Sequence, residues 1–381
     1  MPAVPERHLE HRELRFKKHA PCRSAVLMSP GSPSSMSPVE MLLESPHSKL
    51  TNEAPEPAPA LCALCGEAMR PWLRLSGDWR RPKAPEPIQL EWCEPCAYGS
   101  LEPRPSLAEL ADHYAVDDYY THHAPRSGDS RRSFGDRLRV RLAWQFDQGV
   151  SAELTPTDLA RFGILPAANL CDIGCGNGGL LRRMAAAGYN VMGLDPDSEA
   201  CRAARSGGLN VLQGSAEQLP ADWDDAQFDA ITMMHVLEHV LDPLAATANV
   251  AKLLRSGGRF FVETPNNACL GLRNAGSAWR WLDAPRHLNF FTPESLQEAC
   301  RRAGLEIEAV ELTGYTRQFQ SEWIADEQEI HRRLQAMSGD EQVTALPPRN
   351  SATRAWRLLA KTWRAPAAAK YDSVRVIARK P

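Results

Sequence analysis

One stretch decides the fold: Asn169-Leu-Cys-Asp-Ile-Gly-Cys-Gly-Asn-Gly-Gly-Leu-Leu181. Its apolar start predicts the end of a buried strand, its glycines predict a turn, and its end predicts the start of a helix. Glycine reaches backbone angles that a Cβ forbids, and it lets a ligand lie against bare main chain. The free N–H groups of the helix point back at this turn. The turn is a candidate nucleotide site, but Gly174-x-Gly176-x-x-Gly179 also fits a dinucleotide fingerprint, so its ligand stays open.

Composition bounds the class of protein. The chain has 381 residues, 43% of them hydrophobic, which suffices for one large or two modest domains. A net charge of −3 argues against a general polyanion binder, although residues 349–381 carry nine Lys/Arg and one acidic residue. No apolar run of about 18 residues and no apolar signal core occur, so we expect a cytoplasmic protein without a membrane span. The ten cysteines then lie in a reducing compartment, where cysteine pairs indicate metal binding or structure.

Changes in composition along the chain predict four parts. Residues 1–60, rich in Pro, Ser and charge, predict a disordered leader. Residues 61–100 predict a zinc-ribbon-like module, and residues 101–164 predict a helical linker that covers the ligand. Residues 165–381 predict the main domain, in which residues 316–370 are a mostly helical insertion before the last strand.

The first module contains two Cys-x-x-Cys pairs: Cys62 with Cys65, and Cys93 with Cys96. Each pair places two sulfurs on one side of a tight turn, and two such turns complete a tetrahedron of thiolates around Zn²⁺. Gly66 follows the first pair and Gly99 lies just past the second, as tight turns favour. Because protein atoms would fill all four positions, the zinc would be structural and not catalytic. Four unrelated buried thiols are the alternative.

From residue 170 onward, hydrophobic runs alternate with helical patterns. We expect strands at residues 169–173, 190–194, 210–213, 228–234, 259–264, 305–312 and 373–379. We expect helices between them, including residues 179–187, 198–205, 243–254 and 293–303. This alternation predicts an α/β fold, with a parallel sheet covered by helices and ligands at the carboxyl ends of the strands. The last strand follows a long insertion, and we expect it to be antiparallel.

Polar residues at two strand ends extend the candidate nucleotide site. Asp195 ends the second strand, 21 residues after Gly174, where a carboxylate can accept both hydroxyls of a ribose. The alternative role for Asp195 is to cap the next helix, a task that Asp197 can also perform. The residues after the third strand are candidates to frame an adenine: Ser215, Ala216 and Glu217.

Several motifs then follow one another: Asp172-Ile-Gly-Cys-Gly-Asn-Gly178, Gly193-Leu-Asp195, Phe228-Asp-Ala-Ile-Thr-Met-Met-His-Val-Leu-Glu-His-Val240, Leu254-Arg-Ser-Gly-Gly258 and Glu263-Thr-Pro-Asn266. In this order they resemble class I S-adenosylmethionine-dependent methyltransferases. The resemblance implies a seven-stranded Rossmann-like sheet in which Asp172 and the glycines hold the methionine end of the cofactor and Asp195 holds the ribose. The family commonly has Asp where this chain has Ser215, whose role Glu217 would take. The full predicted cofactor site is Asp172, Gly174, Cys175, Gly176, Asp195, Ser215, Ala216, Glu217 and His235.

The leading part of the chain carries a second resemblance. After the paired cysteines come Glu102-Pro-Arg-Pro105 and His113-Tyr-Ala-Val-Asp-Asp-Tyr-Tyr120. Together these features are similar to zinc-ribbon methyltransferases among bacterial small-molecule and polysaccharide-modifying enzymes.

The reacting side begins with His235-Val-Leu-Glu-His239, which leaves the fourth strand at the cofactor end. On a helical turn His235, Glu238 and His239 share one face and converge. His287 lies on a loop before another helix. This pattern resembles the metal-dependent branch that includes small-RNA 2′-O-methyltransferases and ubiquinone-biosynthesis O-methyltransferases, where Glu-x-x-Glu-His and a distant His bind a divalent ion. Here Glu238, His239 and His287 match, whereas His235 replaces the first Glu, which weakens the case for Mg²⁺ and leaves a softer ion open.

Three roles stay open for Glu238, His239 and His287. In the first, His239 or His287 is a general base that removes a hydroxyl proton as the methyl group transfers. In the second, the three side chains hold a divalent metal that lowers the pKa of the hydroxyl. In the third, they cap elements and orient the cofactor, and alignment of the reactants supplies most of the catalysis.

Two further groups of residues have alternative roles. An aromatic group either walls an apolar or sugar-binding pocket or belongs to the core: Trp279, Trp281, Phe290 and Phe291. Near the C-terminus, basic residues at helical spacing oppose an apolar stripe: Arg354, Arg357, Lys361 and Arg364 against Trp356, Leu359 and Trp363. We favour an amphipathic helix that covers a domain over one that lies on a membrane or touches nucleic acid.

The sequence therefore predicts a cytoplasmic S-adenosylmethionine-dependent methyltransferase with an N-terminal zinc ribbon. The expected acceptor is a hydroxyl, rather than a carbon or an amine, on a small molecule or sugar. The alternatives are an RNA-modifying enzyme that uses the zinc module and the basic C-terminal helix, a nicotinamide-dependent oxidoreductase, and a non-catalytic binder. Strand four lacks the Asp/Asn-Pro-Pro-aromatic motif of base-amine methylation, so nucleic acid is not the expected partner. The oligomeric state stays open.

Overall fold

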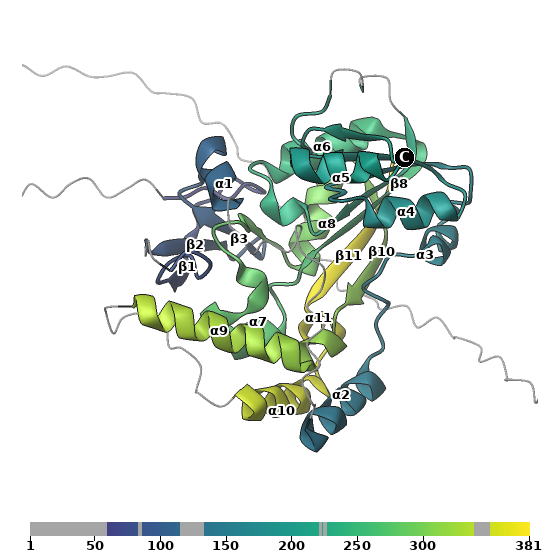
Figure 1. Cartoon of the computed structure of the whole chain (residues 1–381). Coiled ribbons are helices and arrows are strands. Elements are labelled where there is room, and N and C mark those ends of the chain that lie inside the picture. The colour runs from purple at the N-terminus through teal and green to yellow at the C-terminus, as the bar shows by residue number, and fades with distance from the viewer. Residues whose placement is uncertain (1–58, 83–85, 115–132, 221–222, 224–226, 339–350) are drawn as a thin grey trace, which may run out of the picture. The chain divides into compact units, whose positions relative to one another are not determined.

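The structure, a computed structural model, describes residues 59–82, 86–114, 133–220, 223, 227–338 and 351–381 (Figure 1). These residues belong to one compact unit, Pro57–Pro381. The leader predicted for residues 1–60 lies outside the described residues except for its last two positions, and residues 115–120 of the second motif also lie outside them. Among the described helices, none has the length and apolar character that crossing a membrane requires.

The main sheet has seven strands in the order β10-β11-β8-β7-β4-β5-β6. Their bounds are β4 (Asn169–Ile173), β5 (Asn190–Asp195), β6 (Val211–Gln213), β7 (Phe228–Met234), β8 (Leu254–Pro265), β10 (Glu306–Thr313) and β11 (Ser373–Arg379). Strands β4 to β8 are parallel, whereas β11 runs antiparallel to both of its neighbours, β8 and β10. The predicted α/β fold and the antiparallel last strand are confirmed. The strand order reverses at β4, where open sheets of this kind bind ligands.

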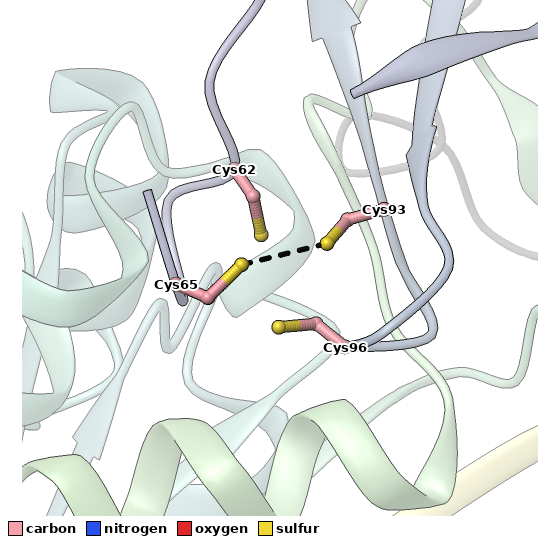
Figure 2. A group of neighbouring side chains, drawn as sticks. All are labelled: Cys62, Cys65, Cys93 and Cys96. Atoms are coloured by element: carbon pink, nitrogen blue, oxygen red, sulfur yellow. Dashed lines mark hydrogen bonds between the residues drawn. The ribbon is translucent and has the colours of Figure 1, made fainter. Parts of the chain in front are cut away.

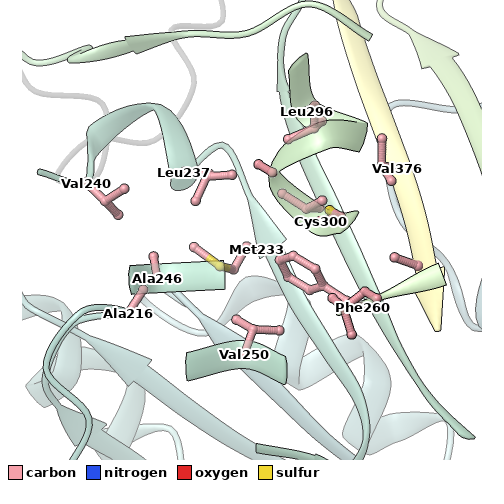
Figure 3. Packing of buried hydrophobic residues seen from close by; sticks show 14 of the residues in the cluster. Ala216, Met233, Leu237, Val240, Ala246, Val250, Phe260, Leu296, Cys300 and Val376 are labelled. Carbon is pink, nitrogen blue, oxygen red and sulfur yellow. The ribbon is translucent and has the colours of Figure 1, made fainter. Parts of the chain in front are cut away.

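Helices cover both faces of this sheet because the strands alternate their side chains. On β8, Phe260 and Val262 pack with α6 (Pro243–Leu253) and α8 (Pro293–Arg302), as Figure 3 shows for Phe260, Val250 and Leu296. The intervening Phe261 points to the opposite face. There it joins the cluster of α3 (Pro156–Arg161), α4 (Gly179–Ala186) and α5 (Ser198–Ser206). The four predicted crossover helices are present, with ends that differ by one residue.

A second, antiparallel sheet joins the N-terminal module to the main domain. It contains β1 (Arg70–Leu75), β2 (Ile88–Cys93), β3 (Tyr98–Glu102) and the short β9 (Asn289–Phe290). A Cβ on Gly99 would lie 3.1 Å from Cβ of Phe290, so glycine permits the close approach of β9. The turn role predicted for Gly99 is therefore wrong: Gly99 lies within β3, and Ala97 adopts the positive φ of 49° beside the second cysteine pair.

The remaining helices are α1 (Leu107–Tyr114), α2 (Phe134–Phe146), α7 (Leu270–Ala275), α9 (Ser321–Met337), α10 (Ser351–Thr362) and α11 (Ala367–Lys370). Short 3-10 turns are η2 (Leu237–His239), η3 (Gly276–Ala278), η4 (Arg280–Leu282) and η5 (Thr316–Phe319). Helices α2 and α10 share one apolar cluster: Ala143, Tyr315, Phe319, Leu358, Leu359 and Tyr371. The C-terminal helix therefore covers part of the domain, as expected.

The two stripes predicted for α10 need correction. Arg354, predicted on the solvated basic face, is 7% exposed and pairs with Glu327 at 3.0 Å. Trp363, predicted on the apolar face, is 55% exposed and stacks on Phe146. A carboxylate from α9 offsets the burial of the Arg354 charge, and this partner is not visible from the helical spacing alone.

We predict that Arg354→Ala destabilises the protein by about 3 kcal/mol, because it leaves the largely buried carboxylate of Glu327 without its cation. Arg357→Ala, on the exposed side of the same helix, should change the free energy of unfolding by less than about 0.5 kcal/mol. Urea denaturation of both variants measures the difference. Equal effects would contradict the buried ion pair.

Candidate active site

The glycine turn lies at the carboxyl end of β4, at the point where the strand order reverses. Gly174, Gly176 and Gly178 adopt φ values of 76°, 54° and 83°, a region that disfavours side chains. Gly178 is the N-cap of α4. A Cβ on Gly176 would have no described neighbour within 4 Å, so the main chain there borders open space. The turn thus offers bare backbone to a ligand.

The thiol of Cys175 faces away from this space. Its side chain is 7% exposed and joins the apolar cluster that contains Leu181 and Met184 of α4. Its backbone N–H donates to the carbonyl of Leu194 at 3.2 Å, and that of Gly174 donates to the same oxygen at 2.7 Å. The main chain of Cys175 therefore borders the turn, while its side chain belongs to the core.

Two carboxylates flank the turn. Asp172 is buried and accepts a 2.6 Å hydrogen bond from the Thr232 hydroxyl, and burial raises its pKa to about 7. Asp195 accepts hydrogen bonds from the N–H groups of Gly176 at 2.7 Å and Asp197 at 2.9 Å, and burial raises its pKa. Asp197 is the N-cap of α5, so the helix does not need Asp195 as its cap.

The residues predicted to frame an adenine already have protein partners. Ala216 is 2% exposed and lies in the core. The Glu217 carboxylate accepts from the backbone N–H of Asp242 at 2.7 Å, and burial raises its pKa. The Ser215 hydroxyl accepts from the N–H of Gln218 at 3.1 Å. All three follow β6, and the contact with Asp242 holds the Glu217 carboxylate at the loop before α6.

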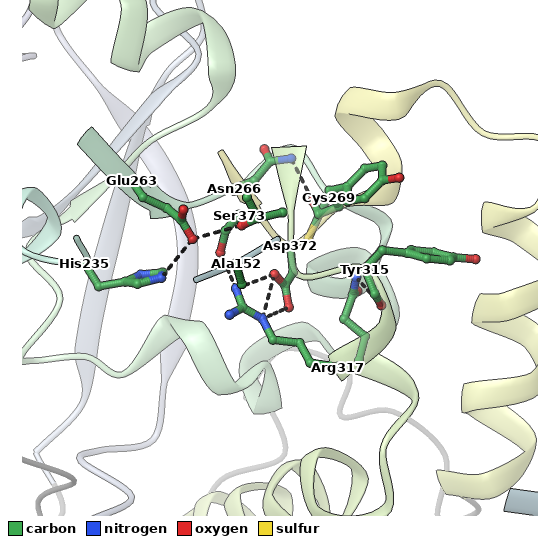
Figure 4. Close-up of polar contacts among 12 residues, drawn as sticks. Ala152, His235, Glu263, Asn266, Cys269, Tyr315, Arg317, Asp372 and Ser373 are labelled. Carbon is green, nitrogen blue, oxygen red and sulfur yellow. Dashed lines mark hydrogen bonds and ion pairs between the residues drawn. The ribbon is translucent and has the colours of Figure 1, made fainter. Parts of the chain in front are cut away.

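His235 contacts Glu238, as the helical spacing predicted, although the turn between them is not an α-helix. It has a positive φ of 58°, and η2 begins only at Leu237. Its Nδ1 lies 3.2 Å from Oε1 of Glu238. Its Nε2 lies 3.3 Å from Oε1 of Glu263, a contact that Figure 4 shows. Both ring nitrogens are therefore engaged by carboxylates, and the imidazole is a partner of Glu238, not a third member of the cluster.

The charge on His235 follows from these contacts. Burial alone would lower its pKa, but the hydrogen bonds and charges of Glu238 and Glu263 raise it to about 9. The ring also stacks on Trp281, with centroids 4.9 Å apart and planes at 14°. On its other side Glu263 accepts hydrogen bonds from Arg375 and Thr313, both at 2.9 Å. His235 is thus an imidazolium held between two buried carboxylates.

Glu238, His239 and His287 form a compact cluster whose potential ligand atoms lie within 4.8 Å of one another. The rings of the two histidines are nearly perpendicular, with centroids 4.6 Å apart. Nδ1 of His239 donates to the carbonyl of Arg286 at 3.0 Å, and Nδ1 of His287 donates to that of Trp281 at 2.7 Å. Because a carbonyl only accepts, the proton of each neutral ring lies on Nδ1, and Nε2 is the nitrogen that carries the lone pair.

The remaining oxygen of Glu238 completes this arrangement. The residue is 1% exposed, and its Oε2 has no hydrogen-bond partner among the described residues. The charge and hydrogen bond of His235 outweigh burial and lower the pKa of Glu238, which keeps it a carboxylate. A buried, unpartnered carboxylate oxygen is costly, so the site offers an anionic donor that calls for a cation. The donor set is one carboxylate and two imidazoles.

Several residues around the cluster were not singled out from the sequence. The hydroxyl of Tyr114 lies 2.8 Å from Nδ1 of His239, and Arg286 supplies the carbonyl for the same nitrogen. In the sequence, Glu263 is visible only as the first residue of the family motif Glu263-Thr-Pro-Asn266. Tyr114 belonged to the motif at residues 113–120, which was the one available signal for it.

The aromatic group divides between core and site. Trp279, Phe290 and Phe291 are at most 1% exposed and belong to the core. Trp281 stacks on His235 and also contacts Arg317, whose guanidinium carbon lies 4.9 Å from the ring centroid. Only Trp281 therefore borders the Glu/His cluster.

The four cysteines of the N-terminal module also converge (Figure 2). Their sulfurs lie within 4.8 Å of one another, and those of Cys65 and Cys93 are 3.6 Å apart. A tetrahedron with Zn–S bonds of about 2.3 Å requires sulfurs about 3.8 Å apart, so the cluster fits Zn²⁺. Cys62 and Cys93 are buried, whereas Cys65 is exposed.

Comparisons with known proteins identify the family to which the chain belongs. A family model described as a methyltransferase domain matches residues 143–310. Ubiquinone biosynthesis O-methyltransferase of Aromatoleum aromaticum is 37% identical over 154 residues, 37% of this chain and 65% of that protein. The enzyme of the same name from Cereibacter sphaeroides is 33% identical over 183 residues, 45% of this chain and 70% of that protein. The chain thus spans about two thirds of the length of these relatives.

The chain is also similar to a solved structure. It is an S-adenosylmethionine-dependent methyltransferase, possible histamine N-methyltransferase, from Thermotoga maritima. It has 20% identity and a TM-score of 0.38, and the match covers 64% of this chain and 92% of that one. From the sequence matches, the chain belongs to the class I S-adenosylmethionine-dependent methyltransferases. This membership indicates S-adenosylmethionine as the methyl donor and argues against the nicotinamide-dependent alternative.

We predict that His235 makes stability depend on pH. Its folded pKa of about 9 lies above the usual value near 6.5, so its contribution is complete below about pH 6.5 and is lost as pH rises through 9. His235→Asn, which tolerates positive φ, lacks this term. Urea denaturation between pH 6.5 and 9.5 should show the difference between wild type and variant shrinking as pH rises. A difference that is constant with pH would contradict the imidazolium.

Proposed function

We propose that this enzyme transfers the methyl group of S-adenosylmethionine to a hydroxyl of a small molecule or sugar beside Glu238, His239 and His287. The observation that carries the proposal is the convergence of these side chains next to the glycine turn. A Cβ on Gly174 would clash with Val236, the residue that follows His235, so the turn and the cluster are neighbours. The names of the relatives, ubiquinone biosynthesis O-methyltransferases, support oxygen as the accepting atom.

On the cofactor side, the residues at the ends of β4 and β5 would each take one part of the ligand. The buried Asp172 and the main chain of Gly174, Cys175 and Gly176 would hold the methionine end. Asp195 would hold the ribose, with its 2.7 Å bond to Gly176 fixing the carboxylate beside the turn. The loop after β6 would frame the adenine through Ser215, Ala216 and Glu217, and His235 would border the methyl group. Alignment of the methyl with an acceptor oxygen lowers the barrier by several kcal/mol, on the order of what proximity supplies.

At the reacting centre, we propose that Glu238, His239 and His287 hold a divalent ion. The residues fit it because Oε2 of Glu238 is buried without a partner and both histidines present Nε2. Two imidazoles and one carboxylate suit zinc, manganese or iron better than magnesium, which prefers oxygen ligands. Such an ion would lower the pKa of the acceptor hydroxyl.

General-base catalysis by a histidine is the competing mechanism. Burial and the charge of His239 lower the pKa of His287 to about 4, so its imidazole is neutral at pH 7 but a weak base. A neutral imidazole with its Nδ1 proton on a carbonyl is the form that ligates a metal. The geometry favours the metal-assisted mechanism for this reason.

For the N-terminal cluster we propose a structural Zn²⁺ held by Cys62, Cys65, Cys93 and Cys96. Its support is the spacing of the sulfurs and the closed set of four thiolates. The module shares a sheet with β9, so its role is toward the protein's own fold rather than toward nucleic acid.

We predict that Asp195→Ala raises the Kd for S-adenosylmethionine at least 10-fold, because a ribose then loses its carboxylate acceptor. Asp197→Ala, which removes only the cap of α5, should cost stability but change this Kd less than threefold. Isothermal titration of both variants compares the two roles. The ribose assignment fails if Asp195→Ala binds as well as wild type.

We predict that wild type binds Mn²⁺ in the Glu/His cluster and that Glu238→Gln weakens this binding at least 10-fold. Manganese is the chosen probe because thiolates do not select it. Glu199→Gln, an exposed carboxylate on α5, is the control and should bind as wild type does. Calorimetry gives the affinities, and methylation of a panel of phenols and sugars with radiolabelled cofactor follows activity before and after chelation. Full activity after chelation would support the general-base mechanism instead.

A further inference from the structure

The loop that carries His287 is part of the N-terminal module's sheet. Directly after it, β9 pairs with β3 in the register Gly99↔Phe290 and Ser100↔Asn289. The N–H of Leu101 also donates to the carbonyl of Leu288 at 3.0 Å. The backbone next to His287 is thus held by hydrogen bonds from the module that bears the four cysteines.

Asn289 passes this restraint to the turn that bears Glu238 and His239. Its Oδ1 accepts from the hydroxyl of Tyr98 and from Nη2 of Arg104, the latter at 2.8 Å. Its Nδ2 donates to the carbonyls of Leu237 at 3.1 Å and Val240 at 2.7 Å. Asn289 is 1% exposed, so these bonds fix η2 against the module without competition from water.

Arg286 forms a second, independent link. Its guanidinium is fully buried and donates to both oxygens of Asp78, at 2.8 and 2.7 Å, and to Asp283 at 3.1 Å. Asp78 lies between β1 and β2 of the module. The carbonyl of the same Arg286 accepts the Nδ1 proton of His239 at 3.0 Å. The side chain of Arg286 is thus anchored in the module while its main chain orients a histidine of the cluster.

We infer that the zinc module positions His239 and His287 of the reacting centre, with Asp78 and Tyr98 as the positioning residues. This inference rests on the proposed function of the Glu/His cluster. Partners that orient a metal-binding histidine typically change metal affinity 10- to 100-fold when removed. The N-terminal module therefore orients the two histidines through the loop that carries His287. This role is separate from any stability that a bound zinc ion would supply.

The residues proposed to bind S-adenosylmethionine serve as an internal control, because their contacts do not involve the N-terminal module. Asp172 is bonded to Thr232 of β7, and Asp195 is bonded to the glycine turn and to Asp197. These contacts lie within the main sheet and its turns. Loss of the positioning contacts should therefore weaken the Glu/His cluster and spare the binding of S-adenosylmethionine, whereas general unfolding would weaken both.

The test compares three variants of the full chain. Asp78→Asn keeps the shape but removes the charge that pairs with Arg286, and Tyr98→Phe removes only the hydroxyl on Asn289. The control, Asp112→Asn, breaks the exposed ion pair with Arg81. Calorimetry should give Mn²⁺ affinities at least 10-fold weaker for Asp78→Asn and Tyr98→Phe, with the Kd for S-adenosylmethionine within twofold of wild type. Asp112→Asn should match wild type in both measurements.

A second readout does not depend on the metal. Nitrogen-15 spectra of the histidine rings should show the Nδ1–H tautomer for His239 and His287 in wild type and in Asp112→Asn. The tautomer of His239 should become mixed in Asp78→Asn. Unchanged tautomers and Mn²⁺ affinity in folded Asp78→Asn and Tyr98→Phe would overturn the inference, as would parallel loss of Mn²⁺ and S-adenosylmethionine binding. Wild type that binds no Mn²⁺ but shows the tautomer change would refute the metal proposal and leave the positioning role supported.

Discussion

The buried guanidinium of Arg286 is the interaction on which the arrangement of the site depends. A charge without exposure to water is tolerated only when carboxylates surround it, and here Asp78 and Asp283 do so from two segments far apart in the sequence. Arg80 adds a further bond to Asp283 at 2.9 Å. These ion pairs hold the loop between η4 and β9, and the carbonyl of Arg286 in the same loop accepts from Nδ1 of His239.

The ion pairs of Arg286 with Asp78 and Asp283 also join the small N-terminal module to the loop that carries His287. The glycine turn and the two carboxylates that flank it are built within the main sheet, where strand order and positive φ leave bare main chain at the end of β4. The Glu/His cluster takes its loop from the shared second sheet. The two halves of the site therefore have different mechanical supports, although Val236 brings them into contact beside Gly174.

Much of the fold followed from local patterns. The bounds of β4, β7 and β11 match the expected strands, since buried runs between turn residues carry a strong signal. Strand β9 was not expected, because two residues have no periodicity and their pairing depends on β3. The family motifs pointed to Glu238, His239 and His287, which lie together in the structure, and the helical spacing predicted the contact of His235 with Glu238. The second contact of the His235 ring, with Glu263, was not predicted, because a positive φ and a 3-10 turn replace the assumed helix.

The sequence by itself determined the glycine turn, the order of strands and helices, and the spacing of two cysteine pairs, because these depend on neighbours along the chain. Tertiary structure alone decided which atoms of the site have protein partners. The carbonyls of Arg286 and Trp281 accept from Nδ1 of His239 and His287, and the ring of His235 contacts Oε1 of Glu238. Oε2 of Glu238 has no hydrogen-bond partner among the described residues. Hydrogen bonds to a backbone carbonyl carry no sequence signature, since every residue presents one.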